Sequence, residues 1–308
     1  MASELIREMS SNILIPEDVL DQIIRSSPYR YKVYKIPKKS GKGVRKIAQP
    51  AKEVKRLQYW IIDNIFPFFE IHQSATAYVS GKNIFNNTQP HCCNPYILKL
   101  DFKNFFPSIK GGDFIAYCKA NPSFRYSDAD LERLTRILFW RPKREEGLQL
   151  SIGAPSSPQL SNAILFQFDS DIYNFCQNKE ICYTRYADDM TFSMHDKFLR
   201  GKTEERVKIV LNELPFPRLE LNQGKTVYGS KAHRRMVTGL ILSNDNRVSL
   251  GRDKKRMISS QIHHFKQGSL SEKGRTRLRG LVGFARSVEP GFMRRMEAKY
   301  GSDLLIEL

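Results

Sequence analysis

The chain has 308 residues, of which 41% are hydrophobic, and it carries a formal net charge of +18 at pH 7. This length suffices for one large core or for two to three subdomains, and so large an excess of Lys and Arg favours a polyanionic partner such as a nucleic acid. No apolar run is long enough for a transmembrane helix, and the basic residues are spread along the chain rather than gathered on one membrane-binding helix.

The cysteine content and the N-terminal residues indicate in which cellular compartment the protein works. The five cysteines are odd in number and show no Cys-x-x-Cys spacing, which argues against a disulfide framework or a structural zinc site. Residues 1–9 include Glu and Arg and lack the apolar core of a secretory signal. We therefore expect a cytoplasmic protein with no membrane partner.

The first third of the chain predicts helices followed by a hairpin. Residues 1–30 place acidic residues and a proline before apolar positions at helical spacing. Residues 31–37 and 44–48 have the composition of strands, and a basic turn with two glycines joins them. This turn could close over a triphosphate, grip a template backbone or be an ordinary exposed turn. An amphipathic helix is expected at 51–69.

An acidic residue then ends a buried strand. Residues 74–91 are polar and are expected to form a loop, whereas 96–100 form a short apolar run typical of a buried strand. Asp101 follows directly, where a charge is unfavourable unless it has a use. Helices are predicted at 113–118 and at 127–140, the second capped by Ser127.

A turn rich in Gly, Pro and Ser occupies residues 151–158. It is predicted to lead into one continuous helix from Gln159 to about Cys176, with apolar residues spaced as a buried stripe. Backbone N–H groups at such a helix start, beside small residues, would let a nucleotide or a template strand lie close. A plain capped helix explains the same residues.

The most informative stretch is 181–194. Two alternating runs flank Ala187, Asp188 and Asp189, which predicts a β-hairpin with both aspartates at its tip. Carboxylates so close together repel each other, and a divalent cation is the usual way to satisfy both. Together with Asp101 they form the set needed to hold two Mg²⁺ ions for phosphoryl transfer. The competing interpretation is a solvated acidic turn.

The last third is expected to be helical and basic. After a helix at 203–214, Lys225 lies on a glycine turn from which it could reach a phosphate, although an exposed Lys is the default. Residues 236–242 and 247–250 are predicted to pair as a hairpin. Beyond residue 252 come two helices rich in Lys and Arg, which is typical of a clamp on a duplex backbone.

Taken in this order, these segments resemble the reverse transcriptases, and specifically the bacterial retron type, from about residue 31 to residue 300. The resemblance implies an α+β right-hand polymerase with fingers, an antiparallel palm sheet and a basic helical thumb. The implied boundaries are fingers at 1–98 with helices at 111–150, palm at 99–110 and 151–240, and thumb at 241–308.

The resemblance also implies roles for single residues. Asp101, Asp188 and Asp189 would be the catalytic residues and would bind the metal ions, helped by the carbonyl of Phe102. The implied dNTP-binding residues are Lys38 and Arg45 on the fingers hairpin, the steric gate Phe106, Gly153, and Lys225, which would protonate or neutralise departing pyrophosphate. Ile152 stands where the family usually has Gln, which affects a side-chain contact at the nucleotide pocket and not the fold.

Two short signatures select the retron branch. Asn-Thr-Gln-Pro-His at 87–91 is similar to the retron Asn-Ala-x-x-His signature, and Val-Thr-Gly at 237–239 matches a second one. The residues implied to be specific for the retron or its RNA are Asn87, His91, Val237, Thr238, Gly239, Arg252, Lys254, Lys255 and Arg256.

The retron resemblance implies a full activity. The enzyme would copy a cognate noncoding RNA, which is both template and primer, into single-stranded DNA with dNTPs and two Mg²⁺ ions. Synthesis would start from a guanosine 2′-hydroxyl and give a branched RNA–DNA, and an effector or toxin protein would join it in antiphage defence. Two alternatives stay open: a noncatalytic RNA-binding scaffold with a polymerase fold, and a group II intron or CRISPR-type reverse transcriptase primed by a 3′-hydroxyl.

Overall fold

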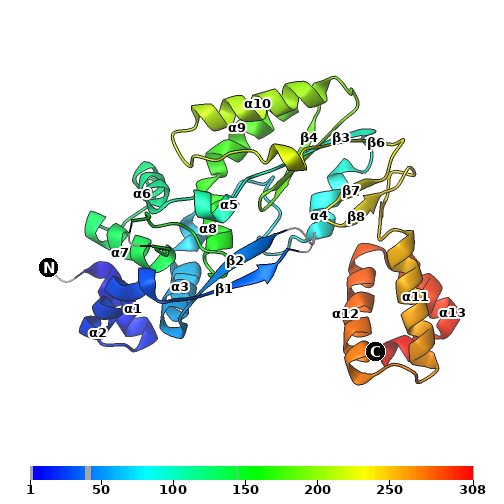
Figure 1. Ribbon diagram of the computed structural model, residues 1–308, viewed down its shortest axis with the longest axis horizontal. Helices are drawn as coiled ribbons and strands as arrows, with labels where there is room; N and C mark the ends of the chain where they lie inside the picture. Colours follow the sequence, from blue (N-terminus) through cyan, green and yellow to red (C-terminus); the bar gives the residue numbers. More distant parts are fainter. Residues whose placement is uncertain (1–2, 39–42, 144, 308) are drawn as a thin grey trace.

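A four-stranded antiparallel sheet lies at the centre of the computed structural model, which describes residues 3–38, 43–143 and 145–307 (Figure 1). The strands run in the order β4–β5–β3–β6. Their bounds are β3 (Tyr96–Asp101), β4 (Cys182–Tyr186), β5 (Asp189–Met194) and β6 (Val227–Ser230). The predicted α+β class, the strand that ends at Asp101 and the hairpin around the Asp pair are therefore confirmed.

Helices that follow the Gly/Pro/Ser turn pack against this sheet (Figure 1). They are α8 (Ser157–Ile164), α9 (Phe166–Gln177) and α10 (Leu199–Glu213). The prediction of one continuous helix at 159–176 is wrong, because the backbone of Leu165 leaves the helical conformation between α8 and α9. No Gly or Pro marks this break in the sequence, so the apolar spacing alone could not reveal it.

The N-terminal region combines a long hairpin with helices. The elements are α1 (Glu4–Ile13), α2 (Glu17–Ser26), η1 (Ser27–Tyr29), β1 (Tyr31–Pro37), β2 (Val44–Pro50), α3 (Lys52–Asn64), η2 (Phe66–Phe68), α6 (Gly111–Ala120) and α7 (Asp128–Leu138). The hairpin β1–β2 is confirmed, although residues 39–42 of its turn lie outside the described residues. Helix α3 is shorter than the predicted 51–69, because Pro67 cannot continue an α-helix. Ser127 caps α7 as predicted.

The segment at 74–91 is not entirely a loop, which corrects the prediction. It contains the short helix α4 (Ile84–Thr88) and the 3₁₀ turn η3 (Gln89–His91). The Asn83 side chain caps α4 by accepting hydrogen bonds from the backbone of Phe85 and Asn86. The polar composition of this segment predicted a loop, but most of its hydrogen-bonding residues form hydrogen bonds within the protein. A similarly short helix, α5 (Phe105–Ser108), follows β3.

A second small sheet leads into the C-terminal helices. Its strands are β7 (Arg235–Val237), β8 (Leu240–Leu242) and β9 (Val248–Ser249). The predicted single strand at 236–242 is wrong: the chain turns at Thr238 (φ 44°) and Gly239 (φ 82°), so β7 and β8 form a hairpin of their own. Positive φ at both central residues suits the twist of a two-residue hairpin turn. The expected pairing around 243–246 is present between β8 and β9.

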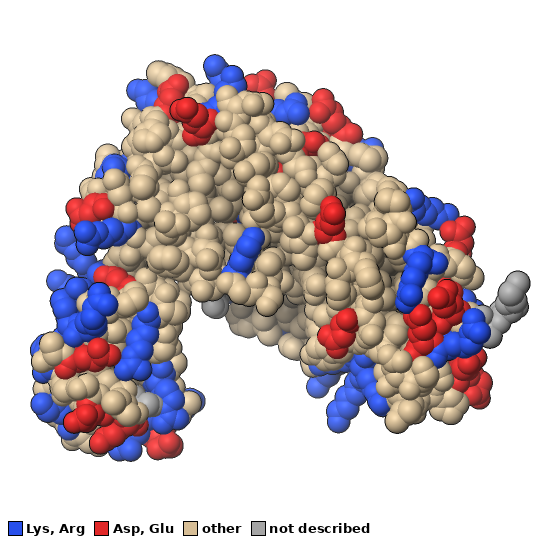
Figure 2. Space-filling model, turned by 180° about the vertical axis from the view of Figure 1, so that it is seen from behind, with Lys and Arg blue, Asp and Glu red and all other residues tan. Residues whose placement is uncertain are grey.

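The C-terminal helices form what we call the helical lobe. Its members are α11 (Arg252–Lys266), α12 (Glu272–Val288), α13 (Pro290–Tyr300) and α14 (Ser302–Ile306). The lobe has a hydrophobic core distinct from that of the sheet, formed by residues such as Ile258, Leu278 and Phe292. Figure 2 shows the molecule hollowed between this lobe and the body, with Lys and Arg gathered on the lobe. Among the described residues, no helix has the length and apolarity to cross a membrane.

Candidate active site

The ends of β3 and the β4–β5 hairpin bring three aspartates to one edge of the sheet. Asp101 lies opposite Asp189 in the β3–β5 register, and the Phe102 N–H donates to the Asp188 carbonyl at 3.1 Å. Ala187 adopts a left-handed backbone (φ 57°) that turns the hairpin tightly. Asp101 is buried, and Asp188 and Asp189 are half-buried. The sheet therefore places Asp101, Asp188 and Asp189 together, as their sequence positions predicted.

The hairpin register is held by aromatic packing behind the aspartates. Tyr183 and Phe192 face each other across β4 and β5, and their rings stack with centroids 4.8 Å apart. Cross-strand aromatic pairs of this kind stabilise one register over a slipped one. A slip by one residue would move Asp188 and Asp189 off the metal-facing edge, so this packing serves the site.

The three carboxylates affect one another's ionisation. Burial, together with the charge of Asp101, raises the pKa of Asp188. Burial and the charges of Asp188 and Asp101 raise the pKa of Asp189 to about 6, although Lys99 opposes this shift. Such shifts mean that the charge of the site is only partly compensated by the chain's own cations.

Lys225 lies directly against this acidic group. Its turn, η4 (Gln223–Lys225), places the Nζ atom 2.8 Å from each carboxylate oxygen of Asp101. Burial acts to lower the pKa of Lys225, but the hydrogen bonds and charge of Asp101 outweigh it and raise the pKa. Lys225 is thus an internal counter-ion of Asp101, with more than half of its side chain still open to solvent.

The donor set fits Mg²⁺ by its chemistry. Three carboxylates and the nearby Phe102 carbonyl are hard oxygen donors. Burial, and then the charge of the neighbouring carboxylates, raises the pKa of Asp188 and Asp189, and a divalent cation would offset both effects. In the part of the chain that the structure describes, no three acidic, His or Cys side chains already surround one point. The Lys225 ammonium lies against Asp101, so this carboxylate already has a cation of the chain beside it.

Asp189 should therefore destabilise the metal-free protein near neutral pH. The pKa of Asp189 is higher in the folded state than in the unfolded state. Its contribution to the stability of the folded state is therefore fully present below about pH 4, where the side chain is protonated in both states, and is lost as the pH rises through about 6. We expect Asp189→Asn to raise the free energy of unfolding at pH 7, without Mg²⁺, by about 1–2 kcal/mol. At pH 4 the two proteins should be nearly equal. Thermal melts at both pH values, with and without Mg²⁺, measure this, and Mg²⁺ should stabilise the wild type more than the variant. Equal stability at pH 7 would contradict the prediction.

Two of the expected nucleotide-binding residues, Phe106 and Gly153, line one groove, and Tyr78 on the same groove is within electrostatic reach of Asp188. Phe106, Ile152 and Gly153 border a groove of about 330 Å³ together with Tyr78 and Pro155. On the β1–β2 hairpin, Lys38 and Arg45 are exposed, and the charge of Arg45 lowers the pKa of Asp188. Arg45 is thus within electrostatic reach of the hairpin tip. The dNTP-binding roles stay predictions.

Gly153 has a steric reason to be glycine. Its φ is +125°, and an added Cβ would lie 3.0 Å from the Ala48 carbonyl oxygen and 3.1 Å from a methyl of Ile47. The Ala48 N–H donates to the Ile152 carbonyl at 2.9 Å, so β2 and this turn are held together. The close approach joins the nucleotide groove to the β1–β2 hairpin.

Gly153→Ala should therefore be destabilising. Backbone strain and a contact with a carbonyl that cannot swing away should cost about 2 kcal/mol. Denaturant unfolding measures this. The matched control is Gly112→Ala in α6, where a Cβ meets nothing within 4 Å and the backbone is helical, so that variant should be neutral or slightly more stable. Equal stabilities of the two variants would contradict the steric explanation.

The residues of the two retron signatures lie next to each other and are mostly internal. Asn87, His91 and Val237 are buried, Thr238 is half-buried and Gly239 is exposed. The Asn87 side chain donates to the Thr238 hydroxyl at 3.4 Å. These contacts are with other parts of the chain. A role for them in reading RNA stays a prediction.

The four basic residues that open α11 differ from one another. Arg252 and Arg256 are exposed, and Lys254 lies over the Phe284 ring at 4.9 Å. Lys255 is paired with Glu289 at 2.6 Å, with about a quarter of its side chain exposed. Arg252 and Arg256 are therefore better placed than Lys255 to meet a phosphate backbone.

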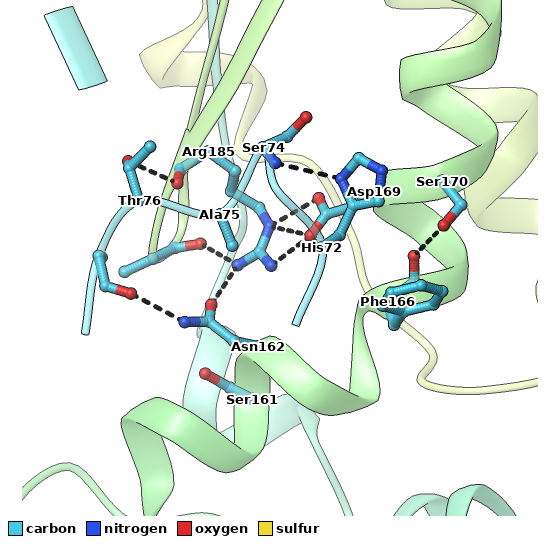
Figure 3. A network of polar contacts seen from close by, with 12 residues as sticks. His72, Ser74, Ala75, Thr76, Ser161, Asn162, Phe166, Asp169, Ser170 and Arg185 are labelled. Carbon is cyan, nitrogen blue, oxygen red and sulfur yellow. Dashed lines mark hydrogen bonds and ion pairs between the residues drawn. The ribbon is translucent and has the colours of Figure 1, made fainter. Parts of the chain in front are cut away.

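Sequence reasoning missed a buried group behind the hairpin tip (Figure 3). The Arg185 guanidinium is fully buried and donates to the Asp169 carboxylate, with Nε 2.8 Å from Oδ1. It also donates to the Asn162 side chain and to the Ala187 carbonyl, both at 3.0 Å. Asn162 comes from α8, Asp169 from α9 and Arg185 from β4. The signal available in the sequence was Asp169, an acidic residue on the apolar stripe of its helix, three residues before Ile172.

Comparisons with known proteins agree with this geometry. The family model for reverse transcriptase (RNA-dependent DNA polymerase) matches residues 36–242. The chain is 44% identical over 288 residues to the Retron Ec83 reverse transcriptase of Escherichia coli, covering 92% of each chain. It is 31% identical over 308 residues to the Retron Ec86 reverse transcriptase of the same species, covering 97% of this chain and 92% of the other. The chain therefore belongs to the reverse transcriptase family, as a bacterial retron reverse transcriptase with RNA-directed DNA polymerase activity.

Proposed function

We propose that this enzyme copies a cognate noncoding RNA into single-stranded DNA by two-metal nucleotidyl transfer, starting from a guanosine 2′-hydroxyl of that RNA. The observation that carries the two-metal part is the meeting of Asp101, Asp188 and Asp189 at one edge of the sheet. The similarity to retron reverse transcriptases supports the RNA template and the primer. The product would be a branched RNA–DNA.

The metal-binding residues follow from the donor set. Asp101, Asp188 and Asp189, with the Phe102 carbonyl, would hold two Mg²⁺ ions. When bound, these ions supply activation of the attacking hydroxyl and stabilisation of the departing pyrophosphate. For Asp101 to take part, the Lys225 ammonium has to leave its carboxylate. Lys225 would then be free to neutralise or protonate the pyrophosphate a short distance away.

The groove beside the aspartates would receive the incoming dNTP. Phe106 is half-buried on this groove, and its ring would exclude a 2′-hydroxyl, which selects deoxynucleotides. Lys38 and Arg45 on the β1–β2 hairpin would meet the triphosphate. Ile152 offers no hydrogen bond to the nucleotide from its side chain, so recognition at that point would rely on the backbone and on Gly153.

The remaining parts of the proposal concern domains and context. The fingers would span 1–98 with 111–150, the palm 99–110 and 151–240, and the thumb 241–308. The basic helical lobe would hold the RNA-containing duplex in the hollow seen in Figure 2. We further propose a cytoplasmic enzyme that works with an effector or toxin protein in antiphage defence.

The test uses the protein expressed with its native flanking DNA. Nucleic acid from the wild type and from the Asp188→Asn/Asp189→Asn variant is separated before and after ribonuclease and debranching treatment. A discrete DNA, present only in the wild type and shifted by debranching, is the expected result. A DNA that carries no branch would contradict 2′-priming and favour a 3′-primed lineage. RNA bound by both proteins without any DNA would contradict the catalytic proposal and favour an RNA-binding scaffold.

A further inference from the structure

Residues 84–91, comprising α4 and η3, run between the catalytic hairpin and the β7–β8 turn, and we call them the connector. The connector is short, yet Asn87, Thr88 and His91 are each fully buried. Buried polar side chains are costly unless their hydrogen bonds are satisfied. The partners of these three residues therefore indicate what the connector does.

His91 joins the connector to both strands of the catalytic hairpin. Its Nε2 is 2.8 Å from the Thr184 hydroxyl on β4, and its Nδ1 is 2.8 Å from the Ser193 hydroxyl on β5. Burial lowers the pKa of His91 to about 3, so the ring is neutral, with one donor and one acceptor nitrogen that both find partners. The Thr184 hydroxyl also donates to the Asn87 carbonyl at 3.1 Å. These two strands carry Asp188 and Asp189 at their tip.

The opposite side of the connector bonds to the β7–β8 turn. The Thr88 hydroxyl lies 3.0 Å from the Thr238 hydroxyl and 3.2 Å from the Val237 carbonyl, while its shortest contact is with the Ile84 carbonyl within α4, at 2.7 Å. Asn87 also reaches the Thr238 hydroxyl, as described above. In addition, Ile84 and Phe85 pack against the hydrophobic core of the helical lobe. The connector is thus attached by polar contacts to the β7–β8 turn, and by apolar contacts to the hydrophobic core that this small sheet shares with the helical lobe.

Asn87 links the two sides through one more residue. Its side-chain oxygen accepts a hydrogen bond from the Thr76 hydroxyl at 2.8 Å, and the Thr76 backbone N–H donates to the Arg185 carbonyl at 2.9 Å. Figure 3 shows Thr76 beside Arg185, whose guanidinium contacts the tip of the hairpin. A continuous set of hydrogen bonds therefore runs from Ala187 through Arg185, Thr76 and Asn87 to Thr238.

A second attachment lies parallel to the first. The buried Arg235 guanidinium, on β7, donates to the Asn94 carbonyl and to the Ser243 carbonyl, the latter at 3.0 Å. The Asn94 side chain in turn donates to the Ser193 hydroxyl at 2.8 Å. The Ser193 hydroxyl therefore contacts both His91 and the Asn94 side chain. Strand β5 is thus linked to β7 by two routes, one through the connector and one through Asn94 and Arg235.

We propose that the connector sets the position of the helical lobe relative to the catalytic aspartates, and that Asn87, His91 and Thr238 are positioning residues within it. The two signature segments, 150 residues apart in the chain, are then two halves of one internal contact. A polymerase must keep the duplex held by one part of the molecule in register with the metal-binding carboxylates of another, and small errors in such placement are costly. The proposal rests on the RNA-directed DNA polymerase activity of the family and not on guanosine priming.

The experiment measures synthesis on an added primer and template, so it does not depend on the cognate RNA. The wild type and the variants Thr238→Val and Asn87→Leu extend oligo(dT) on poly(rA) with a heparin trap that allows one binding event. Each variant loses the Asn87–Thr238 hydrogen bond and one further contact, with Thr76 in the case of Asn87 and with Thr88 in the case of Thr238. We expect the mean product length to fall at least two- to tenfold in each, roughly the range that a single lost hydrogen bond gives. Thr203→Val is the matched control, because it makes the same change at a threonine that is more deeply buried than Thr238 and whose hydroxyl donates to the Leu199 carbonyl within α10. Its product length should equal that of the wild type.

Further readouts separate positioning from the alternatives. Affinity for the template–primer should stay within about twofold of the wild type. The effects of Asn87→Leu and Thr238→Val should be less than additive in the double variant, since both changes break the Asn87–Thr238 contact. A fall in template–primer affinity with no change in product length would overturn the proposal and would mean that these residues bind nucleic acid. The proposal would also be overturned if product length fell together with the melting temperature in every variant, including Thr203→Val. Thr238→Val changes only one group of atoms, so it keeps the test valid even where Asn87→Leu does not fold.

Discussion

Asp188→Asn and Asp189→Asn, made singly, should each reduce DNA synthesis by at least about 1,000-fold. Each change keeps the size of the side chain but removes a negative charge from the edge where Asp101 and the hairpin tip meet. Metal-assisted charge stabilisation is worth several kcal/mol, and each 1.36 kcal/mol corresponds to a tenfold change in rate. The measurement is the single-turnover rate of dTTP addition to oligo(dT) on poly(rA) across a range of Mg²⁺ concentrations.

The fold should survive these changes, and this separates catalysis from structure. Both aspartates are half-buried and their pKa values are raised, so replacing either one relieves repulsion instead of breaking a favourable pair. Asp245→Asn is the control, because Asp245 is exposed on the turn between β8 and β9 and far along the chain from the aspartates. It should leave the rate unchanged. Loss of rate together with loss of folding in Asp188→Asn would show that the acidic pair is structural.

The placement of these aspartates was predictable because it depends on short-range patterns. Alternating strands on either side of a two-aspartate turn specify a hairpin, and an apolar run specifies the strand that ends at Asp101. Antiparallel pairing of those two units then brings Asp101 opposite Asp189. The first two steps use a period or a turn preference that can be read from a few residues, whereas the pairing of β3 with β5 was expected only because the aspartate pair needs a third carboxylate.

What could not be predicted depends on contacts between distant segments. The break at Leu165 has no local signal, yet it lets Asn162 on α8 and Asp169 on α9 both reach Arg185. The same holds for Asn87 and Thr238, whose contact is formed only when the connector meets the β7–β8 turn. Polar residues in such segments look like surface residues in a sequence, because their partners lie on other elements, 16 to 151 positions away in these examples.

Asp169→Asn should be one of the most destabilising single changes in this protein. It would leave the Arg185 guanidinium buried and without its counter-ion, and both side chains are completely inaccessible to solvent. Removing one partner of a buried pair costs about 3–5 kcal/mol, which is a large part of the 5–15 kcal/mol that typically separates folded from unfolded protein. The Tyr183 hydroxyl, which donates to Oδ1 of Asp169 at 2.7 Å, would keep only an uncharged amide oxygen as its acceptor. Urea unfolding followed by circular dichroism measures the loss.

The control for charge removal is Asp128→Asn. Asp128 pairs with Lys119 at 3.2 Å, but both side chains are more than half exposed, so this change should cost less than about 1 kcal/mol. A cost for Asp169→Asn no larger than that of Asp128→Asn would contradict the importance of the buried pair.

A double replacement then separates the charge from the packing. Arg185→Met combined with Asp169→Leu removes both buried charges, and it should recover much of the stability that Asp169→Asn loses. It should not recover activity, because Met cannot donate to the Ala187 carbonyl, which Arg185 holds at 3.0 Å. The hairpin tip would then lack an anchor directly behind Asp188. A stable double variant with wild-type synthesis would show that the buried pair serves the fold alone, whereas a stable and slow variant would assign Arg185 to the positioning of the catalytic aspartates.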